Sequence, residues 1–169
     1  MKTKMVIKNQ KGASAVEFAF VLPLLIILLF GIIEFGLLLY NKAVTTNACR
    51  EAARETIVLK NPKLDSAGRD ALIQNTITTY ITNRLISFGQ SNIPATPGGW
   101  TRVNVPPVYD FNHSIIDSNS NGFGDAGESL TVQVRYYYSF LLLPNLMQLA
   151  KGSLTNTVTV NSVTIMRFE

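Results

Sequence analysis

The sequence predicts an α+β protein in which a long N-terminal helix crosses a membrane and continues into a small domain with a second helix and an antiparallel β-sheet. Three observations predict it: an uncharged apolar run over residues 18–33, helix-spaced apolar residues after that run, and alternating strand-like patterns in the C-terminal third. The 169 residues suffice for an anchor and one domain. Charged residues are 15% of the chain, against roughly 25% in soluble domains, so part of the chain is expected in lipid.

Positive charge is concentrated at the N-terminus. Four lysines and no acid occur in residues 1–12: Lys2, Lys4, Lys8 and Lys11. Without these four, the 15 basic side chains fall to 11, which equals the 11 acidic ones, so the rest of the chain is neutral. A neutral domain predicts no nucleic-acid partner. The lysines place the N-terminal end in the cytoplasm and the remainder outside.

The predicted membrane span covers residues 18–39, and the bilayer is therefore the first expected partner. Its 22 residues give about 33 Å of helix, enough for a hydrocarbon core of about 30 Å. The alternative is a secretory signal peptide that is removed whole, but its apolar core is usually only about 7–15 residues long. Helix formers continue beyond the span, so one helix is expected over residues 13–60, ending before Asn61-Pro62.

The outer domain is predicted to occupy residues 61–169. Apolar residues at helical spacing predict a second helix over residues 66–88. Alternation over residues 103–105 and 130–136, with a Thr- and Val-rich stretch at 154–168, predicts strands.

The single cysteine, Cys49, excludes an internal disulfide framework. It is expected to be a buried structural thiol, with intermolecular pairing as the alternative.

Two acids interrupt the apolar segment. Glu17 lies at its edge in the sequence GASAVEFA at residues 12–19. A carboxylate there is costly unless it finds a partner, so Glu17 is a candidate functional residue, with a headgroup-level position as the alternative. Glu34 follows 17 residues later, near the predicted outer face. We expect it to contact headgroups or another subunit rather than act in a proton relay, which would need further polar partners.

Together with Pro23, residues 12–19 resemble the TadE-like minor pilins, or pseudopilins, of the tight-adherence (Flp) type IV pilus family. The sequence NACREAAR at residues 47–54 also resembles that family, and VTIMRFE at residues 163–169 does so more weakly. The similarity is strong over about residues 11–60, and the middle of the chain has no family motif. It implies a pilin-like fold and a role in pilus assembly, initiation or adhesion.

The resemblance also implies roles for individual residues. A prepilin peptidase would cut between Gly12 and Ala13, which removes the basic leader at residues 1–12. Glu17, then the fifth mature residue, would pair with the charged N-terminus of a neighbouring subunit, and Phe18 is the aromatic typical of the Flp subclass. The implied partners are the peptidase, other pilin subunits and the inner-membrane assembly platform. The implied location is the inner (cytoplasmic) membrane and, after assembly, an extracellular filament.

Residues 117–128 read DSNSNGFGDAGE and match the calcium-loop pattern D-x-[DN]-x-[DN]-G-x5-E at every fixed place. The expected oxygen donors for Ca²⁺ are Asp117, Asn119, Asn121, the Phe123 carbonyl, Asp125 and Glu128. Gly124 departs from the pattern, because its place usually holds an apolar residue. Only three formal charges are available, so binding of about 10⁻⁴–10⁻³ M is expected. The alternative is a solvated Asn- and Gly-rich loop.

Other chemistry is not indicated by the sequence. The lone histidine, His113, is predicted to be a surface loop residue, and residues 136–138, all tyrosines, a strand with rings on both faces. No phosphate-binding loop or zinc spacing occurs. The chain is therefore not expected to be an enzyme. The alternative function is an unprocessed single-span protein with a calcium-stabilised extracytoplasmic binding domain.

Overall fold

The computed structural model describes residues 11–58, 65–90, 92–142 and 157–169. Most of the predicted leader and the predicted helix stop at Asn61-Pro62 lie outside these residues. The elements in chain order are α1 (Lys11–Ile57), α2 (Ser66–Ile81), β1 (Thr101–Val103), β2 (Tyr109–Ile116), β3 (Ser129–Ser139) and β4 (Thr157–Arg167). The strands form one antiparallel sheet in the order β1-β2-β3-β4. The predicted fold class is confirmed.

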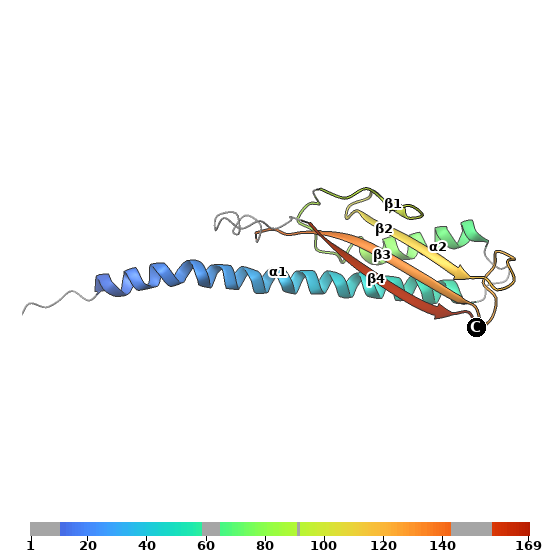
Figure 1. Ribbon diagram of the computed structural model, residues 1–169, viewed down its shortest axis with the longest axis horizontal. Helices are drawn as coiled ribbons and strands as arrows, with labels where there is room; N and C mark the ends of the chain where they lie inside the picture. The colour runs from blue at the N-terminus through green and yellow to red at the C-terminus, as the bar shows by residue number, and fades with distance from the viewer. Residues whose placement is uncertain (1–10, 59–64, 91, 143–156) are drawn as a thin grey trace, which may run out of the picture.

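The helix α1 organises the molecule. Its 47 residues give a length of about 70 Å, and the helix continues through Pro23. One half projects free of the domain, and the other half lies along the sheet beside α2 (Figure 1). Its buried positions recur every three or four residues and form one stripe: Glu34, Asn41, Val44, Thr45, Ala48, Cys49, Ala52, Ala53 and Thr56. This stripe is the face that meets the sheet and α2.

The second helix is shorter than predicted. Asp65 caps α2 by accepting the Gly68 N–H at 2.8 Å, and Ile73, Ile77 and Ile81 form its buried face. The predicted helix over residues 66–88 ends at Ile81 because the following segment is held by α1. Asn41, which is fully buried, donates its amide N–H to the Ile86 carbonyl at 2.8 Å and accepts the Ile86 N–H at 3.0 Å.

The sheet contains one strand that the sequence pattern did not predict. Strand β2 pairs along its whole length with β3, from Tyr109 opposite Tyr136 to Ile116 opposite Ser129. Polar residues 112–114 hide its alternation. Strands β3 and β4 lie in the predicted regions, whereas β1 covers Thr101–Val103 and shares only Val103 with the predicted strand at residues 103–105. Tyr137 points to the opposite face from its neighbours, since its hydroxyl donates to Asp110 at 2.5 Å.

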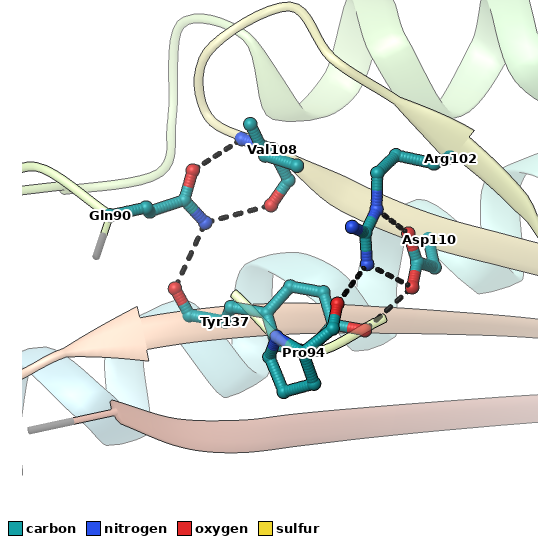
Figure 2. A network of polar contacts seen from close by, with 6 residues as sticks. All are labelled: Gln90, Pro94, Arg102, Val108, Asp110 and Tyr137. Carbon is teal, nitrogen blue, oxygen red and sulfur yellow. Dashed lines mark hydrogen bonds and ion pairs between the residues drawn. The ribbon is translucent and has the colours of Figure 1, made fainter. Parts of the chain in front are cut away.

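Two polar side chains fix the long segment before β1 to the sheet, as Figure 2 shows. Gln90 donates to the carbonyls of Val108 at 2.7 Å and Tyr137 at 2.9 Å, and also accepts the Val108 N–H. Arg102 forms a two-pronged contact with the buried Asp110, at 2.8 and 3.1 Å, and donates to the Pro94 carbonyl. Such charge-assisted pairs are geometrically specific, so this segment has a defined position without regular structure.

Cys49 is fully buried and free, as predicted for a structural thiol. Burial raises the pKa of its thiol to about 12. The thiol therefore stays protonated at neutral pH, which disfavours disulfide exchange.

Replacing the buried Asn41 by alanine should destabilise the domain by about 1–3 kcal/mol, because the partly buried N–H and C=O of Ile86 would lose their partners. Urea denaturation of the detergent-solubilised chain, followed by near-UV circular dichroism, measures this loss. Asn47→Ala is the matched control, since Asn47 is exposed on the same helix. Equal stabilities of the two variants would contradict the assigned role of Asn41.

Candidate functional site

The free half of α1 carries the predicted processing and contact residues. The helix is long and apolar enough to cross a membrane, and its apolar window has no buried residue. Gly12 and Ala13 lie exposed in its first turn. Glu17 is exposed one turn further on, and Phe18 is 59% exposed. All four residues are accessible on one short stretch of helix.

Glu34 lies where the free half of α1 meets the domain. It was expected to contact headgroups or another subunit, but its side chain is only 3% exposed and turns toward its own chain. Its carboxylate accepts the backbone N–H groups of Leu141 and Leu142, just after β3, the second at 3.4 Å. A cavity of about 100 Å³ adjoins this contact. Its walls are Phe30, Ile33, Glu34, Leu37, Phe88, Leu141 and Leu142.

The loop over residues 117–128 is held by hydrogen bonds among several of the residues that the sequence predicted as ligands. The Asp117 carboxylate accepts the N–H groups of Asn121 at 3.3 Å and Gly122 at 2.7 Å. One oxygen of Asp125 lies 2.7 Å from the side-chain amides of both Asn119 and Asn121. Gly122 has φ of 79°, the left-handed conformation expected at the sharp turn of such a loop.

Glu128 closes the loop from the other side. It is 7% exposed, and its two carboxylate oxygens accept the N–H groups of Ser118 at 2.7 Å and Asp125 at 3.0 Å. Phe123 is half-buried and donates its N–H to Asn121 at 2.8 Å. Within the described part of the chain, no three carboxylate, imidazole or thiol groups approach closely enough to hold a metal by themselves. A cation would therefore depend on amide and carbonyl oxygens, which Ca²⁺ accepts and Zn²⁺ does not favour.

The calcium-loop pattern usually has an apolar residue at the place of Gly124, and the structure explains why this chain has glycine there. A Cβ atom at Gly124 would lie 2.1 Å from the ring of Phe168, which is 5% exposed and belongs to the main core. The C-terminal phenylalanine thus occupies the space that an apolar side chain at this place would fill. The loop is joined to the C-terminus by the Phe168 N–H, which donates to Glu128, and by the Gly127 N–H, which donates to Phe168.

Two further side chains hold this loop. Arg69 of α2 donates to the Gly122 carbonyl at 2.8 Å, and Arg167 of β4 donates to the Gly127 carbonyl at 3.0 Å. Sequence reasoning did not single out these arginines or the role of Phe168. The one sequence signal for Arg167 and Phe168 was the weak resemblance of residues 163–169 to the family, which did not indicate what these side chains contact.

His113 is not in a surface loop, as was predicted, but in β2. Its side chain is 15% exposed and its Nδ1 lies 3.1 Å from Asp70 of α2. Burial lowers the pKa of His113 in spite of the neighbouring carboxylate, so the imidazole is mostly neutral at pH 7. Its place between sheet and helix indicates a structural role.

Comparison with protein families finds a match for the N-terminal part of the chain. The family model described as TadE-like protein matches residues 12–54. The matched region begins at the glycine of the proposed cut, covers the free half of α1, and ends with the small residues that pack against the sheet. The resemblance of this segment to TadE-like proteins is confirmed. No match is found among curated proteins or among solved structures.

Replacing Gly124 by alanine should cost about 1–3 kcal/mol, because the Phe168 ring must leave its place in the core. In a Phe168→Ala background the same change should cost almost nothing, since the obstructing ring is gone. Urea denaturation of the four chains forms a double-mutant cycle that isolates this coupling. Gly98→Ala is the control, because a Cβ there meets no atom within 4 Å. Additive effects would refute the contact.

Proposed function

We propose that this chain, with a TadE-like segment at residues 12–54, is a minor pilin or pseudopilin of a tight-adherence (Flp) type IV pilus or secretion system. The observation that carries the proposal is the division of α1 into a free apolar half and a half that is the spine of the domain. A membrane-anchored, pilus-associated protein accounts for both halves. The role is assembly, initiation or adhesion rather than catalysis.

The proposed maturation is a cut between Gly12 and Ala13 by a prepilin peptidase. Both residues are exposed, and cleavage removes all four N-terminal lysines, which hold the leader on the cytoplasmic side. The C-terminal domain then lies outside the inner membrane, and the subunit stays anchored until it joins or primes a filament. The assembly platform and other pilins are its proposed partners.

Glu17 is proposed to neutralise the new N-terminus of a neighbouring subunit. In the mature chain the amino group at Ala13 and the Glu17 carboxylate are four residues apart, on one face of the helix. A bundle of such helices excludes water, where an unpaired charge is costly and a pair is much less so. The exposed Phe18 beside Glu17 would pack in the same bundle.

Gly12→Val should block this maturation, because a branched side chain would stand at the bond to be cut. When the chain is co-expressed with a prepilin peptidase, mass spectrometry should find residues 1–12 lost from the wild type and kept in the variant. Gly31→Val is the matched control on the same helix and should be cut normally. An intact Met1 in the wild-type membrane fraction would contradict the proposal and favour the unprocessed single-span alternative.

Glu17→Gln separates cleavage from assembly in the same strains. It leaves the scissile bond unchanged, so the leader should still be removed. Crosslinks to neighbouring pilin subunits should decrease, because the variant cannot neutralise an adjacent N-terminus. Wild-type levels of crosslinking would reject the proposed role of Glu17 but leave the cleavage site standing.

We also propose that the loop at residues 117–128 binds Ca²⁺ as a structural ion. The fit rests on the position of the oxygens and on the C-terminal ring that replaces the missing apolar side chain at Gly124. The amide groups of Asn119 and Asn121 now direct N–H toward Asp125. Binding would require each amide to present its oxygen instead. The Phe123 carbonyl would supply a further ligand, as the pattern requires.

Calcium at 10 mM should stabilise the folded chain by about 1.4 kcal/mol if the dissociation constant is near 1 mM. Thermal unfolding and calorimetric titration of the full detergent-solubilised chain test this, with Mg²⁺ as the ion control. Asp125→Asn should abolish the response. Asp65→Asn, at the cap of α2, should keep it, because asparagine also caps helices well. No heat and no stabilisation would exclude the site.

A further inference from the structure

We propose that the membrane-facing end of the domain enters the outer lipid leaflet, with Phe88 and Leu141 in contact with acyl chains and Glu34 fastening this end to α1. These three residues are here named the domain base. The inference rests on the membrane anchor proposed above and adds a second, lipid-contacting surface to it. It concerns how deep the folded domain lies, which the length of the helix alone does not determine.

The spacing of the two acids on α1 sets the depth. Glu17 and Glu34 are 17 residues apart, or about 25 Å along the helix. A hydrocarbon core is about 30 Å thick. Both carboxylates therefore cannot lie at opposite edges of the core, and when one of them is at an edge the other is about 5 Å inside it.

The surroundings of the two acids decide which one lies inside. Glu17 is exposed on the free helix, so it would meet lipid directly. Glu34 is 3% exposed and receives the N–H groups of Leu141 and Leu142, so the protein itself supplies its polar partners. A carboxylate with hydrogen-bond donors costs far less in a low-dielectric medium than a bare one. Glu17 therefore lies at the inner edge, and Glu34 lies below the outer edge.

The residues around Glu34 suit that position. Phe88 and Leu141, each 46% exposed, flank it and line the same small cavity with Phe30 and Ile33 of the free helix. Among the described residues beyond Tyr40, Phe88 is the one large aromatic side chain that is this exposed. Phenylalanine is among the side chains that insert favourably into the hydrocarbon region. This cavity thus brings apolar side chains of the free helix together with Phe88 and Leu141 of the domain base.

The opposite end of the domain has a different character. It carries the loop with Asp117, Asp125 and Glu128, and the exposed Ile116 at the end of β2 stands beside it. This end provides an internal reference, because it lies far from the free half of α1 (Figure 1).

Single tryptophans placed in the full chain test the proposal. In a Trp100→Phe background, tryptophan is introduced at Phe88, Leu141, Leu28 or Ile116, each exposed in the wild type. The chains are reconstituted into vesicles of phosphatidylcholine and phosphatidylglycerol in which the phosphatidylcholine carries bromine near the headgroup end or in the middle of the acyl chain. Bromine quenches tryptophan on contact, in either orientation of the protein. Far-UV circular dichroism confirms that each variant is folded.

The expected quenching depends on how deep each tryptophan lies in the bilayer. Leu28→Trp should lose emission most with mid-chain bromine. Phe88→Trp and Leu141→Trp should lose it most with bromine near the headgroup and shift to the blue, while Ile116→Trp should keep it. Quenching at residue 28 without quenching at 88 and 141 would overturn the proposal while leaving the anchor intact. Absence of quenching at residue 28 would overturn the anchor itself.

Discussion

The close contact between α1 and the sheet is the interaction on which the rest of the domain depends. It is possible because the helix presents side chains no larger than alanine or cysteine at its tightest points: Ala48, Cys49, Ala52 and Ala53. All four are fully buried, and the sheet residues Val132 and Val134 belong to the same cluster. Larger residues here would move the sheet outward, and interiors packed to crystal density do not absorb such shifts easily. The TadE-like match ends at residue 54, so it includes this contact as well as the anchor.

The features that depend on local pattern could be predicted from the sequence. The long helix α1, the start of α2 and strand β3 follow from hydrophobic period and from residues typical of helices and strands. The residue spacing at 117–128 predicts a calcium loop, which stays a prediction. The end of α2 could not be predicted, because it depends on Asn41, which is 45 residues away from Ile86. Strand β2 was missed for a related reason: its pairing with β3 is non-local, and the polar residues that interrupt its alternation are accommodated by partners such as Asp70.

The partners of the charged side chains also could not be predicted, because they are far away in the sequence. The sequence placed Glu17 and Glu34 in one apolar segment and gave both an external partner, since a partner within the chain could not be seen. The structure separates them: Glu34 is satisfied by backbone N–H groups just after β3, more than a hundred residues later, whereas Glu17 remains exposed. Because Glu34 has hydrogen-bond donors within its own chain and Glu17 is exposed, the proposed contact with a neighbouring subunit is assigned to Glu17. The proposed inter-subunit contact therefore narrows to the first turns of the helix.

The domain has two apolar clusters arranged along α1. The cluster nearer the free half of α1 contains Tyr136, Tyr138 and Val160 with Leu37 and Leu38 of α1. The contact between Glu34 and Leu141 lies on the side of this cluster that faces the free half. The larger cluster contains the alanine-rich part of α1 and is closed at its far end by Phe168 under Gly124. An ion in the loop at residues 117–128 would act on the far cluster through Phe168, whereas contact with lipid would act on the near one through Glu34. Both α1 and β3 run through the two clusters, and Leu85 packs against each of them, so the anchor and the outer loop are connected through the helix and through the sheet.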